Sequence, residues 1–302
     1  GGLRRHELRG RGATEAAAVS LAAQAAQIAR ESSHPDAAPA GIDVRGVTHV
    51  FNKGAANEFL ALDDVSLTVA RGELHCLLGP SGCGKSTLLY LIGGFIPTQS
   101  GRIATPAGEV RGPGPDRGVV FQSFALFPWL TVRDNVLYGL RKTGMPRREQ
   151  EERAQAYIEL VHLRGFEQAY PAQLSGGMQQ RAAIARTLAV DPDILLMDEP
   201  FGALDAQTRR LMQEELLRIW KDSRKTIVFV THDVQEAVFL ADRVSVMSAR
   251  PGRIADVVAG GFNRSDDPHV TRTKQFAERA EELWDLVRLQ AERQARDSGA
   301  RP

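Results

Sequence analysis

The stretch "GPSGCGKST", Gly79 to Thr87, decides the fold of this chain. Gly79 and Gly84, followed by Lys85 and Ser86, match the pattern G-x-x-x-x-G-K-[ST] in full. In such a loop the backbone N–H groups turn toward phosphate oxygens, and the helix that starts near Lys85 adds the positive end of its dipole. The alternative is a plain glycine turn, but the complete match between a strand and a helix favours a phosphate loop.

All nine residues of this loop are candidate phosphate contacts: Gly79, Pro80, Ser81, Gly82, Cys83, Gly84, Lys85, Ser86 and Thr87. Lys85 is expected to reach the β and γ phosphates of a nucleotide, and the Ser86 hydroxyl to ligate Mg²⁺. Because Cys83 lies within the loop, we expect its thiol to react with a bulky maleimide and nucleotide to protect it. Cys76, in a buried strand, is expected to react slowly.

Three nearly continuous apolar runs each end in a group that can do chemistry. The run "LHCLLG" ends in the glycine loop, "ILLMDE" ends in Asp198 and Glu199, and "TIVFVTH" ends in His232. Runs that are apolar on both faces suit a parallel sheet covered by helices, and ligands of such sheets bind beyond the carboxyl ends of the strands. The sequence therefore predicts an α/β fold in which these groups share one edge.

Each of these polar residues also has a structural interpretation. Asp198 and Glu199 suit an aspartate that holds Mg²⁺ through water and a glutamate that deprotonates the attacking water, whereas the alternative is that both cap the next helix. His232 alone is typical of a core or cap histidine, but its place beside the acids favours the site. Gln122, which follows "RGVVF", is weak evidence by itself.

Composition excludes several classes of protein. The chain has 302 residues with 38 Lys+Arg and 37 Asp+Glu, so no net field points to nucleic acid. Two cysteines argue against a disulfide framework and fit a reducing compartment. No apolar run approaches the roughly 18 residues of a membrane span, and no signal peptide is visible.

The chain divides into three expected regions. Residues 1–41 are expected to form a disordered or helical extension, and residues 42–260 a nucleotide-binding domain with a helical insert at about 122–183. Residues 261–302 are expected to form a helical tail, because apolar side chains recur there at helical spacing. These side chains are Phe276, Ala280, Leu283, Val287 and Ala291.

A second glycine motif, "LSGGMQQR" from Leu174 to Arg181, also opens a predicted helix. Ser175 and the N–H groups of Gly176 and Gly177 form a second possible phosphate cradle at a helix N-terminus, although one nucleotide needs only one. The alternative is a serine that caps the helix.

With all these motifs in view, the chain resembles the ATP-binding subunit of ABC transporters over roughly Ile42 to Ile254. The family's motifs follow in its order: Walker A at Gly79–Thr87, the Q-loop Gln122, the signature at Leu174–Gly177, Walker B at Ile194–Asp198, the catalytic Glu199, the D-loop ending at Asp205 and the H-loop His232. Two departures occur: Met178 stands where the family has glutamine, and Gly202 where its D-loop has serine.

The resemblance implies a P-loop NTPase (RecA-like) core with a small antiparallel β region and an α-helical insert. It also implies an ATPase whose subunits dimerise head to tail around two MgATP, so that the signature of one chain serves the nucleotide of the other. Ser86, Gln122 and Asp198 would then serve Mg²⁺, Glu199 would activate water, and His232 would steady the γ-phosphate.

The aromatic residue that stacks on adenine is expected at Phe51. Phe59 is the alternative, and so is a phenylalanine that only fills the core. The apolar stretch at 124–129 is expected to dock a membrane subunit, unless Phe124, Phe127 and Trp129 fill the core of the insert instead.

Two stretches, "FQSFALFPWLTVRDNV" and "VQEAVFLADRVSVMSARPGRI", resemble the ATPases of nitrate, taurine and alkanesulfonate importers. This implies two separate permease subunits, an indirect partner in a periplasmic or extracellular solute-binding protein, no nucleic acid, and a peripheral place on the cytoplasmic face of the inner membrane. Alternatives are a soluble ABC ATPase outside transport, or the ATPase of an exporter with separate membrane subunits.

Overall fold

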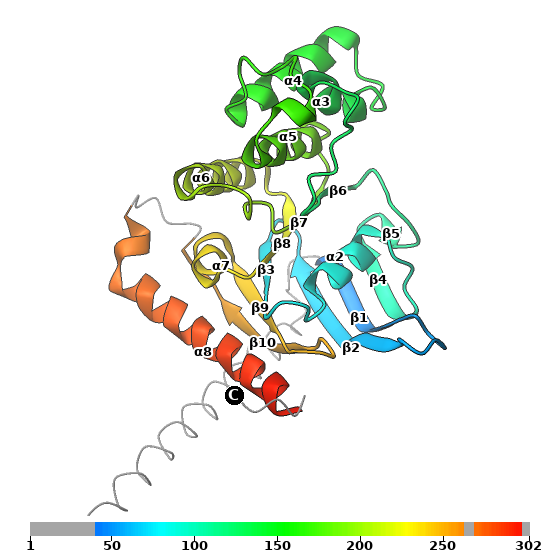
Figure 1. Ribbon diagram of the computed structural model, residues 1–302, viewed down its shortest axis with the longest axis vertical. Helices are drawn as coiled ribbons and strands as arrows, with labels where there is room; N and C mark the ends of the chain where they lie inside the picture. Colours follow the sequence, from blue (N-terminus) through cyan, green and yellow to red (C-terminus); the bar gives the residue numbers. More distant parts are fainter. Residues whose placement is uncertain (1–39, 263–268, 298–302) are drawn as a thin grey trace, which may run out of the picture.

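A computed structural model describes residues 40–262 and 269–297 (Figure 1). The expected extension at 1–41 lies outside them, except for Ala40 and Gly41, which already belong to the first strand. Among the described helices, none combines the length and the apolar character that a membrane span requires.

The core is a six-stranded sheet in the order β10-β9-β3-β8-β7-β6. Its strands are β3 (Leu74–Leu78), β6 (Arg117–Val120), β7 (Ile194–Asp198), β8 (Thr226–Thr231), β9 (Arg243–Met247) and β10 (Ile254–Ala259). All pairings are parallel except that of β10 with β9. Every residue of β3, β7 and β8 is buried, which is why these strands are apolar runs without alternation.

A four-stranded antiparallel sheet in the order β2-β1-β4-β5 lies beside the core. It consists of β1 (Ala40–Phe51), β2 (Phe59–Ala70), β4 (Ser100–Thr105) and β5 (Gly108–Glu109). Helix α2 (Lys85–Gly93) lies between the two sheets (Figure 1). Leu88 of α2 belongs to one buried apolar cluster with Leu62 of β2 and Leu77 of β3, so the sheets are held together through this helix.

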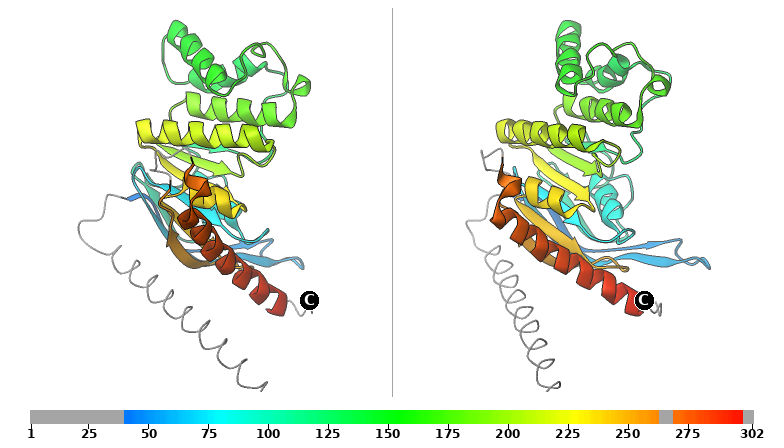
Figure 2. Two further views of the ribbon diagram at one scale, coloured as in Figure 1. Left: turned by 90° about the vertical axis from the view of Figure 1, so that its left-hand side faces the viewer. Right: turned by 60° about the vertical axis from the view of Figure 1, so that its left-hand side comes forward.

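The helical insert stands above the sheets in Figure 1 and in both views of Figure 2. It contains α3 (Val132–Leu140), α4 (Arg147–Leu160), the 3-10 turn Pro171–Gln173 and α5 (Gly176–Ala189). Thr131 caps α3 by accepting a hydrogen bond from the backbone N–H of Asp134, and Pro146 precedes α4, as expected for helix starts. Helix α5 continues to Ala189, beyond the insert boundary expected at about 183.

In the described part of the chain, three further helices follow the insert. They are α6 (Ala206–Ser223), α7 (Val234–Leu240) and α8 (Lys274–Asp297), the last preceded by the 3-10 turn Val270–Arg272. Helix α8 contacts α7 and β9, and buries Phe276, Ala280 and Leu283. Val287 is half-buried and Ala291 is exposed, whereas Gln290 is buried, so near its end the helix packs through a position that the apolar spacing does not indicate.

The predicted fold class is confirmed by this architecture: an α/β core with a parallel sheet, a small antiparallel region and a helical insert. Because β3, β7 and β8 are parallel neighbours, their carboxyl ends meet at one edge. The sequence motifs that follow these strands are therefore brought together.

Candidate functional site

The glycine loop connects β3 to α2 at this edge. Gly82 and Gly84 have φ values of 74° and 99°, a left-handed conformation that favours glycine. A Cβ at Gly84 would also lie 2.6 Å from the Leu62 side chain. Because of these two constraints the loop turns tightly into the N-terminus of α2, where unpaired N–H groups and the helix dipole favour a phosphate.

Lys85 is enclosed by the loop that precedes it. Its Nζ donates to the carbonyl oxygens of Gly79 at 2.8 Å and Pro80 at 3.0 Å, and the residue is 6% exposed. The ammonium group is therefore held at the floor of the loop rather than free in solvent.

The structure contradicts the expectation that Cys83 presents an accessible thiol. Cys83 is 1% exposed, and its Sγ lies 3.7 Å from Lys85 Nζ. Burial raises the pKa of the thiol, although the nearby Lys85 ammonium opposes this. The Cys83 side chain points into the apolar cluster around α2, so we expect slow maleimide reaction at Cys83 as well as at Cys76.

Asp198, the last residue of β7, is fully buried and bound by two hydroxyl groups. Ser86 Oγ donates to Asp198 Oδ1 at 2.8 Å, and Tyr90 Oη donates to Asp198 Oδ2 at 2.8 Å. Burial raises the pKa of Asp198, and both hydrogen bonds oppose the rise. Burial and the hydrogen bond to Asp198 in turn raise the pKa of the Tyr90 hydroxyl.

Glu199 follows in a left-handed conformation with a φ of 45°. Its backbone N–H donates to the Val230 carbonyl at 3.0 Å, which extends the β7–β8 ladder by one step. Its Oε2 lies 3.1 Å from His232 Nδ1 and 3.5 Å from Gln122 Nε2. A non-glycine residue at positive φ is a strained conformation that recurs in active sites, and here it directs Glu199 toward Gln122 and His232.

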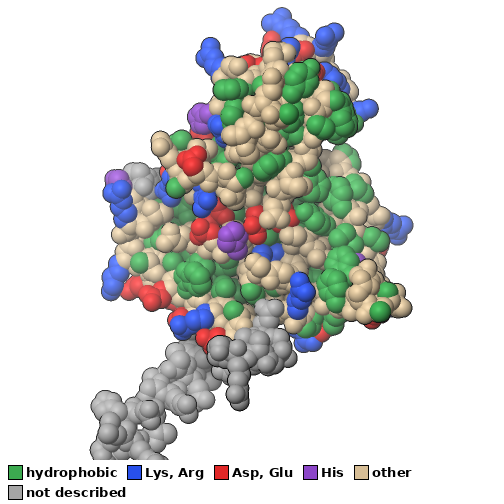
Figure 3. Space-filling model, viewed as in Figure 1, with side chains coloured by type: hydrophobic (Ala, Val, Ile, Leu, Met, Phe, Trp, Pro, Cys, Tyr) green, Lys and Arg blue, Asp and Glu red, His purple; other side chains and the backbone are tan. Residues whose placement is uncertain are grey.

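Some of these residues line a cleft of about 310 Å³, whereas Asp198 and His232 lie next to lining residues and are not themselves part of its wall. Its lining contains Phe51, Phe59, Ala61, Ser81, Gly82, Gly84, Lys85, Ser86, Thr87, Gln122, Glu199 and Arg250. Acidic side chains and a histidine gather in the middle of the molecular face that Figure 3 shows, between the insert and the sheets. The phosphate loop and the groups after β6 and β7 thus share one cavity, as the strand ends predict.

Two aromatic rings form part of the wall of the cleft. Phe51, at the end of β1, and Phe59, at the start of β2, are stacked with ring centroids 5.1 Å apart and planes at 25°. Both rings line the cleft, so the geometry keeps Phe51 and Phe59 as candidates for stacking on a planar base.

The signature motif does not join this cleft. Ser175 is the N-cap of α5, and its hydroxyl accepts from the Met178 N–H at 3.3 Å. Met178 contributes only its backbone N–H to this cap, while its half-buried side chain packs against the main apolar cluster. Asp205 caps α6 by accepting from the N–H groups of Gln207 and Thr208, which lowers the pKa of Asp205. None of Ser175, Gly176, Gly177 or Asp205 lies among the described residues that line the cleft.

Tyr90 and Arg250 are two polar residues at this site that the nucleotide-site motifs do not indicate. Tyr90 contacts Asp198 across 108 positions, and Arg250 contacts Gly82 across 168. The sequence contains one weak indication for Tyr90, since this residue lies one helical turn after Ser86, which is itself a predicted site residue. Arg250 has no local signal, because only the packing of the β9–β10 loop brings it to the cleft.

The residues at the edge fit a hydrated Mg²⁺ with nucleotide oxygens as further ligands. Mg²⁺ prefers oxygen ligands, keeps several waters and is usually held by one or two carboxylates plus phosphates. The Ser86 hydroxyl and Asp198 supply such oxygens side by side, because a hydroxyl can donate its hydrogen to a carboxylate and still offer a lone pair.

Fold and site together define the class of this protein: a P-loop ATPase, with its phosphate loop and acidic pair at the carboxyl edge of a parallel sheet. The family model described as "ABC transporter" matches residues 62–202. The chain belongs to the ABC transporter family and is one of its ATP-binding ATPase subunits.

Relatives are similar over most of their length. An uncharacterized ABC transporter ATP-binding protein of Methanocaldococcus jannaschii is 53% identical, covering 75% of this chain and 84% of its own. The nitrate import ATP-binding protein of Synechocystis is 44% identical in a match that covers 82% of this chain and 95% of the relative. The taurine import ATP-binding protein of Rhizobium johnstonii is 50% identical in a match that covers 74% of this chain and 87% of the relative.

Solved structures show the same likeness. An ATP-binding cassette in a dimeric post-hydrolysis state with ADP and Pi has a TM-score of 0.66 and 32% identity, covering 72% of this chain and 98% of that one. The predicted family resemblance is confirmed by these comparisons.

Proposed function

We propose that this chain powers an importer, by dimerising around two MgATP and hydrolysing them beside two separate permease subunits. The observation that carries this proposal is the single cleft that joins Lys85, Ser86, Gln122 and Glu199. It sits in a chain whose relatives are named nitrate import and taurine import ATP-binding proteins. The same names support a peripheral place at the cytoplasmic face of the inner membrane.

In this mechanism the phosphate loop binds and Glu199 activates water. Lys85 and the loop N–H groups hold the phosphates, and Ser86, Asp198 and Gln122 would hold Mg²⁺, which supplies charge neutralisation. Glu199 accepts a proton from the attacking water. His232, which lies 3.1 Å from Glu199 Oε2, orients that carboxylate and contacts the γ-phosphate.

We further propose that each ATP lies between the phosphate loop of one chain and the signature of a second copy. Ser175, Gly176 and Gly177 open α5 outside the cleft of their own chain, yet they form the small, donor-rich helix start that suits an anion. The likeness to a dimeric cassette with ADP and Pi supports this arrangement. Asp205, which precedes α6, is proposed to contact the same interface.

Mixing two inactive variants tests the shared site. Lys85→Ala spoils the phosphate loop, and Ser175→Arg puts a bulky cation where small donors meet the γ-phosphate. Each homodimer then has two broken sites, but the mixed dimer has one intact loop facing one intact signature. We expect the mixture to recover ATPase activity up to about half the parental rate per mixed dimer, as measured by phosphate release.

If the signature served its own chain, every site in the mixture would carry a lesion and no activity would return. Crosslinking in the mixture, with membrane subunits added where assembly needs them, shows whether mixed dimers form. Mixed dimers with no activity would leave two explanations, namely a site within one chain or closure that needs ATP in both sites. ATP binding measured on the mixed dimer separates them, since only the shared site binds ATP there with parental affinity.

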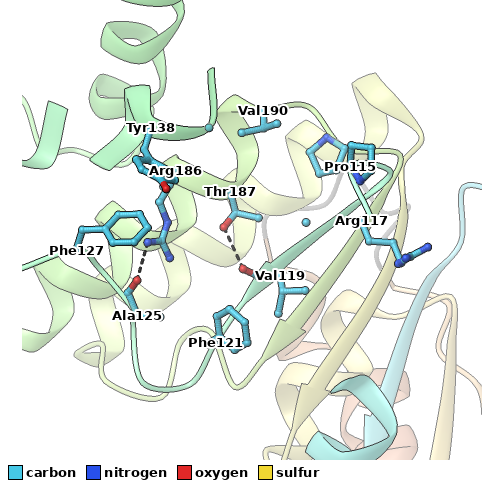
Figure 4. A pocket seen from close by; sticks show the side chains of 13 residues that line it. Pro115, Arg117, Val119, Phe121, Ala125, Phe127, Tyr138, Arg186, Thr187 and Val190 are labelled. Carbon is cyan, nitrogen blue, oxygen red and sulfur yellow. Dashed lines mark hydrogen bonds between the residues drawn. The ribbon is translucent and has the colours of Figure 1, made fainter. Parts of the chain in front are cut away.

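An apolar groove beside Gln122 supports permease docking. It measures about 360 Å³ and is lined by Val119, Phe121, Phe127, Tyr138 and Arg186, among others (Figure 4). The Phe127 ring lies 4.4 Å from Tyr138 and 5.7 Å from Trp129 between centroids. Trp129 is 70% exposed, and neither Phe124 nor Phe127 is fully buried, so these rings do not simply fill the core of the insert.

Trp129→Ser tests this docking site in proteoliposomes that contain the permease subunits. An exposed tryptophan at the centre of an interface commonly contributes about 2 kcal/mol, so we expect affinity for the permease to fall about 30-fold. ATP hydrolysis by the isolated chain should stay at the parental rate, because Trp129 does not line the nucleotide cleft. Phe166→Ser, at another exposed ring of the insert, is the control; equal losses in both variants would contradict docking at Trp129.

The solute is proposed to be a small anion such as nitrate, taurine or a sulfonate. The support is the naming of relatives that are 44–50% identical. Uptake of labelled nitrate and taurine into the same proteoliposomes, with the solute-binding protein added outside, distinguishes these solutes and tests the direction of transport.

A further inference from the structure

Arg250 lines the nucleotide cleft and lies outside the seven nucleotide-site motifs, although it belongs to the longer stretch that resembles importer ATPases. It lies in the loop between β9 and β10, at residues 248–253. Ser248 braces this loop from within: its Oγ donates to the Pro251 carbonyl at 3.0 Å and accepts from the Arg253 N–H at 2.9 Å. The position of the Arg250 backbone is therefore well defined.

The same loop is packed directly on the phosphate loop. Gly252 donates to the Ala61 carbonyl at 2.9 Å and accepts from the Asp63 N–H at 3.0 Å, so it is fixed to β2. A Cβ at Gly252 would lie only 2.1 Å from the Cys83 carbonyl oxygen. The backbones of the two loops are thus in contact at a point where no larger residue fits.

The Arg250 side chain reaches across to one peptide group of the phosphate loop. Its Nε donates to the Gly82 carbonyl oxygen at 2.9 Å, and its guanidinium lies 5.5 Å from the centre of the Phe59 ring. Gly82 is a glycine with a φ of 74°, so its backbone has little intrinsic preference for one orientation. The bond from Arg250 holds this carbonyl against the β9–β10 loop.

The direction of that carbonyl matters for an anion site. A phosphate loop binds because its N–H groups turn inward, and a carbonyl oxygen that turned toward the phosphates would repel them. We propose that Arg250 is a positioning residue, which fixes the Gly82–Cys83 peptide so that its carbonyl stays turned away from the phosphates. This inference rests on the proposed phosphate role of the glycine loop.

Arg250→Met removes the charge and the donor but keeps much of the side-chain volume. We expect KM for ATP to rise about tenfold, the scale of one lost charge-assisted hydrogen bond, while kcat at saturating ATP stays within about twofold. A lysine can still donate to the Gly82 carbonyl, so Arg250→Lys should recover part of the loss. A purely structural role would instead lower the melting temperature and the active fraction, with KM unchanged. Arg253→Met, in the same loop but paired with Asp63 outside the cleft, is the matched control.

Inorganic tripolyphosphate separates the phosphate loop from the base site. Because it lacks base and sugar, its binding by calorimetry should weaken in Arg250→Met by about the same factor as that of ATP. A loss of affinity confined to ATP would show that Arg250 acts through Phe59 and not through the phosphate loop, and would overturn the proposal. Unchanged affinity for both ligands would overturn it as well. Lys85→Ala is measured in parallel: if Lys85→Ala also leaves tripolyphosphate binding unchanged, the proposed role of the glycine loop itself fails.

Discussion

Glu199→Gln is expected to bind ATP as the parent does and to hydrolyse it about 10²–10⁴-fold more slowly, the range for losing a general base. An amide keeps the shape of the side chain, and glutamine adopts a φ of 45° about as readily as glutamate does. It loses the ability to accept a proton from water. Turnover is measured by phosphate release, and ATP affinity by calorimetry.

The same variant should accumulate as an ATP-bound dimer, visible by size-exclusion chromatography with ATP and Mg²⁺. Glu214→Gln is the control, because Glu214 is an exposed residue of α6 that pairs with Arg210. Hydrolysis by Glu199→Gln at the parental rate would remove Glu199 from the mechanism. An equal loss in Glu214→Gln would show that the effect is not specific to the site.

Lys85→Ala is expected to lower ATP affinity by at least about 100-fold, because the nucleotide loses more than one charge-assisted hydrogen bond in a partly desolvated loop. Calorimetry gives the affinity, and thermal unfolding shows whether the loop survives the loss of bonds to Gly79 and Pro80. Lys142→Ala, at an exposed lysine of the insert, is the control. Unchanged ATP binding by a folded Lys85→Ala protein would contradict the assignment of the phosphate loop.

The sequence was sufficient to place the glycine loop, Asp198, Glu199 and His232 at one edge. Each follows an uninterrupted apolar strand, and parallel strands end on the same side, so their meeting is a property of chain direction and needs no knowledge of packing. At Gly202 the contact within the chain is made by the backbone, since its N–H donates to the Glu199 carbonyl at 3.2 Å, and a serine could make the same bond.

Other features depend on side chains that meet across long sequence separations. Cys83 looks accessible in a loop sequence, but its side chain turns into the cluster beneath α2. Tyr90 reads as one more polar position of a helix, yet it binds Asp198. Arg250 reaches Gly82 only because Gly252 lets two backbones approach closely. Tertiary packing sets such contacts, and the periodic pattern of apolar residues in the sequence does not predict them.

The enclosure of Lys85 has a consequence for which anions the loop prefers. Its ammonium already donates to two carbonyl oxygens, at Gly79 and Pro80. An entering ligand therefore replaces these hydrogen bonds and does not meet an ammonium group that is hydrated by free solvent. The ordering of the lysine side chain, about 2 kcal/mol of rotamer entropy, is incurred on folding and not on binding. A small anion with one oxygen in reach replaces a single carbonyl and gains little. A polyphosphate chain offers several oxygens at once, so the exchange discriminates against simple phosphate ions.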